Sequence, residues 1–461
     1  MARNHWSRRD VLKAGSAAFA APYLIPSHVL GRNGQVGAND RVNVGIIGLG
    51  GRARDIAKTC AGIPEMRVVS ICDCFKPACP AFAKDVGQGA DWSAYEDFRK
   101  MCEAENLDGV MIETTTHARA WVTVQAMQIG MDVYIEKPMC LTIDEGREMV
   151  KAARHYKRVT QVGTQQRSMP INNWASDLVK NGALGKIHTV LAPNFIGPDR
   201  WVSQPAKPMP PGASEGWWDI WSNQTAVRPY HPQIQHGWAR WWDYDGGGRV
   251  FGVTGWGTHS YDQINRALGT DETGPVEVWL EEPVKVMETG KFEKREIQDD
   301  ETGAPYYRMA KVVGPRGRVR MKFANGTELR MHLDGDRGPG LGAIFIGEKG
   351  KIEINRDKIA SNPKDLIRVP ENPGSNQKPE TQYHIENWVE CIKTRKRCTA
   401  DIEYGQRSST LCYLVNIVRD IGQVGKHLRW DPEAERFTNS DAGNKMLARD
   451  RRKGYELPAL T

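Results

Sequence analysis

Short apolar runs alternate with amphipathic stretches over residues 41–164. The runs of strand length are Val42–Ile47, Val68–Cys72, Gly109–Glu113, Asp132–Ile135 and Thr160–Gly163. The stretches with helical spacing of apolar residues are Arg52–Thr59, Trp92–Cys102, Ala118–Ile129 and Ile143–His155. Strands that alternate with helices at this spacing predict a parallel, doubly wound Rossmann-type sheet.

The pattern changes after Gln165. A helix over Ile171–Asn181 and a strand over Lys186–Ala192 are predicted first. Later strand-like runs are Val276–Leu280, Arg318–Phe323, Glu328–Leu333, Ala343–Gly347 and Lys351–Asn355. Helical periodicity returns at His384–Thr394 and Tyr404–Ile421. We therefore expect a second α/β domain with a large, mostly antiparallel sheet over 165–430 and a tail over 431–461, after a first domain over 41–164.

The first 40 residues predict export. Arg8-Arg9 precedes a weakly apolar run, Ala14–Ala21, which is too short to span a bilayer and is typical of a signal peptide. Ala18-Phe19-Ala20 offers a cleavage site, with an uncleaved anchor as the alternative. Residues 24–40 form a Gly/Asn/Pro-rich linker. We predict a twin-arginine signal, recognition by the twin-arginine export machinery, a periplasmic location and no stable membrane span.

Charge and cysteine content narrow the function. Residues 1–40 hold five Lys/Arg and two Asp/Glu, so the net charge of +7 falls to +4 without them. No dense basic run is interleaved with aromatics, which argues against nucleic-acid binding. The nine Cys are scattered. Cys72, Cys74 and Cys79 lack an accompanying Cys/His pair at zinc spacing, so free thiols and no metal site are predicted.

A glycine-rich turn follows the first predicted strand. Gly48-x-Gly50-x-x-Ala53 opens a helix, and Asp73 closes the next strand 20 residues after Ala53. Glycines let a pyrophosphate approach the amides of the helix N-terminus, and the acid can accept hydrogen bonds from the ribose hydroxyls. The order strand, turn, helix, strand, acid predicts a dinucleotide site. The acid favours NAD over NADP, although NADP remains an alternative because Arg52 and Lys76 lie nearby.

Glu136-Lys137-Pro138 follows another predicted strand. At the carboxyl end of a parallel strand these side chains face the crevice where α/β sheets bind ligands. A Lys beside Glu136 can hydrogen-bond a substrate hydroxyl and take part in proton transfer. On its own, the tripeptide is equally typical of a solvated turn.

Taken together, these motifs resemble the glucose–fructose oxidoreductase/inositol dehydrogenase (Gfo/Idh/MocA) family. The resemblance rests on the glycine turn, Asp73 and several further motifs. These are Thr114-Thr115-Thr116-His117, Glu136-Lys137-Pro138, Gly163-Thr164-Gln165-Gln166-Arg167-Ser168, Gly246-Gly247-Gly248, Gly257-Thr258-His259-x-x-Asp262, Gly347-Glu348-Lys349-Gly350, Asp441-Ala442-Gly443-Asn444 and Arg451-Arg452. It covers essentially all residues after 40, and with the leader it is similar to an exported bacterial branch.

The resemblance implies a Rossmann domain joined to a domain whose open sheet borders the active site and mediates assembly, as a homodimer or homotetramer. It implies that Lys137 is catalytic and that His259 faces the substrate. The motifs and the resemblance together predict one cofactor-binding set. Its members are Gly48, Gly50, Gly51, Arg52, Asp73, Thr114, Thr115, His117, Glu136, Lys137, Gln165 and Arg167.

Two positions depart from the family pattern. The family often has Asp-x-Gly-x-His, in which the Asp and His form a relay with the Lys, but here Gly255 stands at the Asp position. Asp262, one helical turn beyond His259, could substitute for it. The usual His-x-His reads His117-Ala118-Arg119, which places a permanent cation at the second position. Arg119 either meets an anionic partner or forms a salt bridge at the start of its helix.

A Trp- and Pro-rich stretch covers 194–243. Its tryptophans are Trp201, Trp217, Trp218, Trp221, Trp238, Trp241 and Trp242. Flat aromatic faces suit the C–H surfaces of a sugar ring, but a buried scaffold or an oligomer interface explains them equally well. His231 and His236 show no metal-like pairing and are expected in loops.

The leading hypothesis is an exported NAD(P)-dependent oxidoreductase that acts on a secondary hydroxyl of a sugar or cyclitol. Lys137, assisted by His259, would remove the hydroxyl proton. Because little free NAD exists outside the cytoplasm, we expect a tightly held cofactor. Two alternatives remain: a redox-assisted, NAD-dependent glycoside hydrolase, and a nucleotide-binding protein with a degenerate catalytic site.

Overall fold

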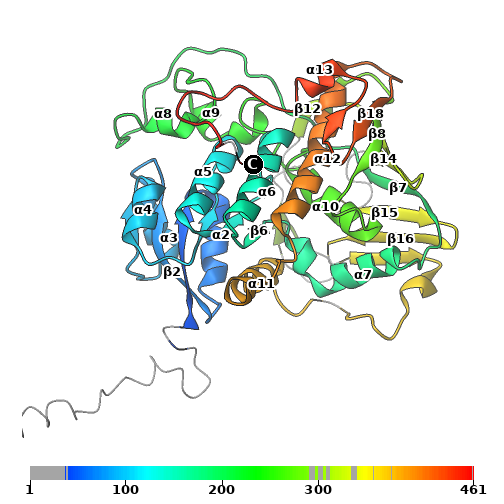
Figure 1. Cartoon of the computed structure of the whole chain (residues 1–461), viewed down its shortest axis with the longest axis horizontal. Helices are drawn as coiled ribbons and strands as arrows, with labels where there is room; N and C mark the ends of the chain where they lie inside the picture. The colour runs from blue at the N-terminus through cyan, green and yellow to red at the C-terminus, as the bar shows by residue number, and fades with distance from the viewer. Residues whose placement is uncertain are drawn as a thin grey trace, which may run out of the picture. The chain divides into compact units, whose positions relative to one another are not determined.

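A six-stranded parallel sheet forms in the first half of the chain in the computed structural model, which describes residues 37, 40–289, 296–298, 305–307, 312–333, 340–356, 358–374, 376–458 and 460. The strand order β3-β2-β1-β4-β5-β6 confirms the doubly wound prediction (Figure 1). The strands are β1 (Val42–Ile47), β2 (Met66–Cys72), β3 (Ser93–Tyr95), β4 (Gly109–Ile112), β5 (Asp132–Ile135) and β6 (Thr160–Val162). The predicted twin-arginine signal lies outside the described residues.

Helices cover both faces of this sheet. They are α2 (Gly51–Cys60), α3 (Ala78–Val86), α4 (Phe98–Ala104), α5 (Thr116–Ile129), α6 (Ile143–His155) and, from much later in the chain, α11 (Glu380–Thr394). Every residue of β4 and β5 is buried, as expected for strands covered on both sides. Trp388 of α11 packs into the same cluster as the β1 side chains, so a distant segment completes this core.

The structure corrects one element of the sequence prediction. The stretch Trp92–Cys102 is not one helix, because Ser93–Tyr95 pairs with β2 as an edge strand and α4 begins at Phe98. Asp97 interrupts the periodicity, since its side chain accepts a hydrogen bond from the Arg99 amide and caps α4. Helix α3 follows Pro77 and was not predicted.

The second sheet has nine strands in the order β17-β16-β15-β7-β14-β13-β8-β18-β19. All neighbours are antiparallel except β7 and β14, which confirms a large, mostly antiparallel sheet. Its strands are β7 (Ile187–Pro193), β8 (Pro275–Leu280), β13 (Val319–Phe323), β14 (Glu328–Leu333), β15 (Gly342–Gly347), β16 (Gly350–Asn355), β17 (Lys358–Asn362), β18 (Leu428–Asp431) and β19 (Arg436–Phe437). Two separate pairs are β9 (Lys285–Thr289) with β12 (Val312–Arg316), and β10 (Glu296–Gln298) with β11 (Pro305–Tyr307).

Three helices pack on one face of this sheet: α7 (Pro170–Lys180), α10 (Trp256–Leu268) and α12 (Ile402–Ile421). Along the strands, side chains alternate between the face covered by these helices and the opposite face. In β13 and β14, Met321, Leu329 and Met331 are fully buried, whereas Arg320 and Arg330 are half-buried on the opposite side. The remaining short elements are α8 (Trp217–Ser222), α9 (Pro232–Gln235), α13 (Asp441–Asn444) and the 3₁₀ turns η2 (Gln165–Ser168), η3 (Trp238–Arg240) and η4 (Lys364–Ile367).

The Trp-rich segment builds its own small core. Trp217, Trp218 and Trp241 are buried together with Tyr230 and Tyr244. Trp218 stacks on Trp221, with ring centroids 4.5 Å apart. Most of these tryptophans are therefore packing residues, which is the scaffold alternative. Among the described residues, no helix is both long and apolar enough to cross a membrane.

Candidate functional site

The glycine turn between β1 and α2 leaves an open cradle at a helix N-terminus. Gly48 has φ +87°, and a Cβ there would lie 2.8 Å from the Thr114 amide nitrogen, so the position requires glycine. Beside Gly50 and Gly51, by contrast, a Cβ would meet nothing within 4 Å. The space that a pyrophosphate needs beside the first amides of α2 is therefore present.

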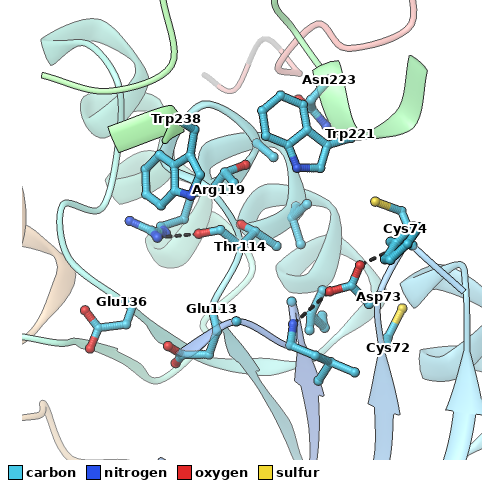
Figure 2. A pocket seen from close by; sticks show the side chains of 18 of the residues that line it. Cys72, Asp73, Cys74, Glu113, Thr114, Arg119, Glu136, Trp221, Asn223 and Trp238 are labelled. Atoms are coloured by element: carbon cyan, nitrogen blue, oxygen red, sulfur yellow. Dashed lines mark hydrogen bonds between the residues drawn. The ribbon is translucent and has the colours of Figure 1, made fainter. Parts of the chain in front are cut away.

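The Asp73 carboxylate bonds to backbone amides of two turns, one after β1 and one after β2. Its Oδ2 accepts a hydrogen bond from the Leu49 amide and its Oδ1 one from the Phe75 amide, each at 2.9 Å (Figure 2). Burial raises the pKa of this carboxyl, while the two amides lower it. A carboxylate has about four acceptor positions, so two remain for the hydroxyls of a ribose.

A cavity of about 810 Å³ extends from the cradle to the second domain. Its walls include Asp73, Thr114, Thr115 and Lys137, and it continues to Trp221, Asn223 and Trp238 beyond them. Figure 2 shows the two indoles on the side of the cavity opposite Glu113 and Glu136. One continuous space thus connects the nucleotide cradle, a lysine and a pair of aromatic faces.

Glu136 fixes the lysine end of this space. Its carboxylate accepts hydrogen bonds from Arg52 Nε (2.8 Å), the Lys137 amide (2.7 Å) and Gln165 Nε2 (3.2 Å). Burial alone would raise the pKa of Glu136, but the charges of Arg52 and Lys137 outweigh it and hold the pKa below its usual value. Glu136 is thus an ionised anchor, and Arg52 reaches it from the first turn of α2.

Lys137 stands at the carboxyl end of β5, after Glu136 and before a cis bond to Pro138. Its Nζ donates to the carbonyl oxygen of Gly255, 3.1 Å away. Burial lowers the pKa of this amine, although Glu136 opposes that effect. An amine with a lowered pKa is suited to exchange a proton near neutral pH.

Glu113 is a further acid at this end. It lines the cavity, yet neither carboxyl oxygen has a hydrogen-bond partner among the described residues. Burial and the neighbouring Glu136 charge raise the pKa of Glu113 well above its usual value. A protonated carboxyl can donate a hydrogen bond to a ligand, which an ionised carboxylate such as Glu136 cannot do.

The two predicted histidines lie behind the cavity wall. His117 Nε2 donates to the Trp221 carbonyl oxygen at 2.7 Å, and burial lowers the pKa of His117 to about 4. His259, in the first turn of α10, is buried, with its Nδ1 lacking a partner among the described residues. Burial and the charge of Lys137 lower the pKa of His259. Both imidazoles are neutral, and neither lines the cavity.

Gln165 and Arg167 also lie outside the cavity wall. Gln165 contacts Glu136, whereas Arg167 donates to Asp262 (2.8 Å) and Asp271 (2.6 Å). Asp262 accepts a further bond from Ser408 Oγ at 2.8 Å. This ion pair is almost fully buried and joins η2 to α10. Asp262 is therefore engaged at the domain junction, and the alternative that it replaces the missing acid at 255 is wrong.

Arg119 forms no salt bridge with the described residues, so the predicted salt bridge at the start of its helix is not found; it bonds neutral backbone and hydroxyl oxygens instead. Its guanidinium donates to the backbone carbonyls of Thr114 and Pro138, which lie in the loops that follow β4 and β5. It also donates to Thr116 Oγ1 at 3.3 Å. The buried cation therefore ties two strand ends together while adding positive charge to the cavity wall.

Asp245 was missed by sequence reasoning. It is fully buried, lines the cavity and accepts hydrogen bonds from the hydroxyls of Thr116 (2.5 Å) and Thr254. The available signal was its place directly before Gly246-Gly247-Gly248, where a charged residue precedes a tight backbone turn. The position of Asp245 in the sequence does not indicate that it lines the same cavity as Lys137.

The cysteines beside Asp73 are buried or half-buried thiols. Among the described residues, no three His, Cys, Asp or Glu side chains are arranged to hold a metal ion. Burial raises the pKa of Cys72 and Cys74, so both remain protonated beside Asp73. All nine cysteines are free thiols in the structure.

Comparison with known proteins identifies the family. Residues 42–164 match the model of the Gfo/Idh/MocA oxidoreductase family, NAD-binding Rossmann fold, and residues 173–457 match that of its C-terminal alpha/beta domain. The chain therefore belongs to the Gfo/Idh/MocA oxidoreductase family. It is an NAD-binding oxidoreductase, which confirms the predicted cofactor class.

Similar curated proteins include both dehydrogenases and glycoside hydrolases. A glycosyl hydrolase family 109 protein of Streptomyces niveus is 24% identical over 294 residues, 60% of this chain and 57% of that protein. A scyllo-inositol 2-dehydrogenase (NAD(+)) of Bacillus subtilis is 26% identical over 147 residues, 32% of this chain and 42% of the relative. The matches thus span less than two thirds of these relatives.

Solved structures share the fold. The WlbA dehydrogenase of Bordetella pertussis, solved with NADH and UDP-GlcNAcA, has a TM-score of 0.55 at 16% identity and covers 85% of this chain and 99% of its own. Myo-inositol 2-dehydrogenase of Lactobacillus plantarum has a TM-score of 0.53 at 18% identity, with 84% and 99% coverage.

Asp73→Asn is expected to weaken NAD binding roughly tenfold to a hundredfold, because charge-assisted hydrogen bonds to the ribose are lost. NADP binding should weaken less, since the variant no longer places a negative charge near a 2′-phosphate. Isothermal titration with both nucleotides measures the two affinities. Asp85→Asn, which alters an exposed partner of Arg54, is the control and should leave them unchanged. Equal losses for NAD and NADP would contradict the role given to Asp73.

Proposed function

We propose that this chain is an exported, NAD-dependent oxidoreductase that acts on a secondary hydroxyl of a sugar or cyclitol. The observation that carries the proposal is the single cavity whose walls include the glycine cradle, Asp73 and Lys137. NAD, when bound, supplies the hydride acceptor. The chain must then supply a proton acceptor for the hydroxyl.

Lys137 is our candidate for that acceptor. Its side chain reaches the cavity from β5, and burial lowers its pKa. Glu136 orients its backbone, and the Gly255 carbonyl accepts from its amine. His259 is neutral and close enough to be influenced by the charge of Lys137, which supports a secondary role behind the lysine.

The far end of the cavity favours a polyhydroxylated ring. Trp221 and Trp238 provide aromatic faces for C–H surfaces, while Asn223, Gln235 and His236 provide hydrogen-bonding groups. Such a mixture of flat apolar faces and polar groups suits sugars and cyclitols. The name of the scyllo-inositol 2-dehydrogenase relative agrees with this substrate class.

A glycoside hydrolase is the second candidate, and the family 109 relatives favour it. In such a reaction a hydroxyl is oxidised transiently, a neighbouring C–H loses its proton, the glycosidic bond breaks by elimination, water adds and the hydride returns. His236 in the cavity wall is the candidate base for the C–H proton. Net cleavage then leaves the amount of oxidised NAD unchanged.

We further propose that the cofactor is retained by the C-terminal segment 449–455, here called the strap. Gly454 and Tyr455 line the cavity, and the Tyr455 ring lies 5.1 Å from that of Trp121 in α5. The strap therefore adds a wall to a cavity formed otherwise by the two domains.

Arginines anchor the strap on both sides. Arg451 donates to Glu145 of α6 at 2.6 Å, and Arg452 donates to Asp219 of α8 at 2.5 Å and to the Asn223 carbonyl at 2.8 Å. The Arg449 guanidinium lies over the Trp242 ring. Opening the cavity at this point requires several charge-assisted contacts to break together.

Assembly as a homodimer or homotetramer is proposed through the face of the nine-stranded sheet opposite the helices. That face carries half-buried Leu191, Ile344 and Ile346 together with Arg320 and Arg330. Mixed apolar and arginine surfaces are typical of protein interfaces.

Lys137→Met should reduce turnover about 10²- to 10⁴-fold, because the proton acceptor is lost. Formation of NADH over a panel of hexoses, hexosamines and inositols measures oxidation, and release of nitrophenol from nitrophenyl glycosides without net NADH identifies the hydrolase. Lys151→Met, an exposed lysine paired with Glu148, is the matched control. Unchanged turnover in the Lys137 variant would indicate a nucleotide-binding protein with a degenerate site.

The double variant Arg452→Ala/Tyr455→Ala should release NAD about tenfold faster, because the strap loses an anchor and a cavity wall. Mass spectrometry of denatured, purified protein gives the amount of NAD retained, and fluorescence of released NADH gives the rate. Lys453→Ala changes an exposed neighbour and should behave as the unaltered protein. Equal release rates in all three proteins would exclude retention by the strap.

Export through the twin-arginine pathway predicts that Arg8→Lys/Arg9→Lys remains in the cytoplasmic fraction. Arg3→Lys, which lies outside the motif, should still reach the periplasm. Immunoblots of the two fractions provide the measurement. Export of the double lysine variant at the normal level would contradict the proposed route.

A further inference from the structure

We infer that Asp245 takes the place of the acid expected at position 255. It lines the same cavity as Lys137, it is held by Thr254, and the next residue, Gly255, accepts a hydrogen bond from Lys137. Asp245 is therefore a positioning residue that adds a negative charge to the surroundings of the lysine. This inference deepens the proposed oxidoreductase function and rests on it for its catalytic meaning. The placement itself is argued from three independent features of the fold.

The first feature is the absence of room at position 255. A Cβ on Gly255 would lie 2.0 Å from the Arg249 carbonyl oxygen and 2.8 Å from that of Gly248. The Gly255 amide also donates to the Gly247 and Gly252 carbonyls, at 3.2 and 3.1 Å. The loop 246–255 thus folds back on itself and occupies the space of a side chain. An acid at 255 is excluded by backbone atoms, which cannot move aside cheaply.

The second feature is the position of Asp245 at the base of the same loop. Its amide donates to the Trp241 carbonyl at 2.9 Å, and Thr116 and Thr254 donate to its two oxygens. Gly248 leaves room for it, since a Cβ there would lie 2.9 Å from the Asp245 carboxyl. Two hydroxyl donors and a glycine therefore hold a fully buried carboxylate at the cavity wall.

The third feature is the distribution of charge around Lys137. The groups that act on it electrostatically are Glu136, Arg52, Asp245 and Arg119, with His259 and Cys412 also close. Glu136 is already engaged by Arg52. Burial raises the pKa of the Asp245 carboxyl above its usual value, whereas its two threonine donors and the charges of Arg119 and Lys137 lower it. Asp245 is the acid in this group without an arginine bonded to it.

Removing the Asp245 charge should lower the pKa of Lys137. Lys137 would face Arg52 and Arg119 with one anion fewer, so its ammonium form would be less stable and its pKa would fall. In oxidation, the rising limb of the pH–rate profile would move to lower pH, and the limiting rate would fall because a weaker base accepts the proton. Loss of packing alone would lower the rate without moving the limb.

The test measures Lys137 directly and needs neither substrate nor NAD. Amine labelling with acetic anhydride at a series of pH values, followed by peptide mass spectrometry, gives the pH at which Lys137 becomes reactive. Asp245→Asn should lower this pH by about one unit, equal to about a tenfold change in neutral amine at fixed pH. Asp243→Asn, which removes a partner of Arg228 two residues away, should have no effect. An unchanged labelling profile in Asp245→Asn would overturn the inference.

A reciprocal measurement covers the case in which Asp245→Asn does not fold. Because the interaction between two charges is mutual, Lys137→Met must raise the pKa of Asp245. Carbodiimide labelling of Asp245 across pH should then shift upward relative to the unaltered protein, and an absent shift would also overturn the inference. Failure of the proposed function is distinguishable, since it would leave both labelling shifts intact while no substrate is turned over.

Gly255→Asp tests the steric argument. It should lower the thermal midpoint strongly, and Asp245→Asn/Gly255→Asp should not recover the labelling profile of the unaltered protein. Recovery by the double variant would show that position 255 has room for an acid and would overturn that part of the inference.

Discussion

The carboxylate of Glu136 holds the site together, because it binds three different elements at once. Arg52 reaches it from the start of α2, Gln165 from the domain junction and the Lys137 amide from its own turn. A buried carboxylate is costly unless its oxygens are satisfied, so these contacts are strongly specified. Fixing Glu136 therefore fixes the orientation of the cradle relative to Lys137, and with it the shape of the cavity.

The two ends of the cavity carry different charged groups. The nucleotide end carries Asp73 and the amides of α2, whereas the lysine end alternates cations and acids within a buried region. Arg119 bridges the two by bonding the carbonyls of Thr114 and Pro138. Low dielectric strengthens each of these interactions, so the charges around Lys137 act on it more strongly than they would in water.

The Trp-rich segment and the strap close the cavity from outside the two sheets. The segment forms a small aromatic core, so it can present Trp221 and Trp238 at fixed positions although it holds little regular structure. The strap then crosses to it through Arg452 and Asp219. Two irregular pieces of chain, far apart in sequence, thus define the face that meets the substrate in the proposed reaction.

The sequence by itself determined most strands of the two large sheets, several of the long helices, the glycine turn with Asp73 and the place of Lys137 after β5, because each depends on local periodicity or on a spacing within one βαβ unit. The prediction of one helix over 92–102 was wrong, because Asp97 caps a shorter helix that begins at Phe98. Tertiary structure alone decided that Arg167 and Asp262 pair at the junction, that α11 completes the first core, and that Asp245 lines the same cavity as Lys137. The Arg167–Asp262 contact joins residues 95 positions apart, and the contact of Arg52 with Thr381 of α11 joins residues 329 positions apart. Local sequence patterns do not predict which residues so far apart in the chain will contact one another.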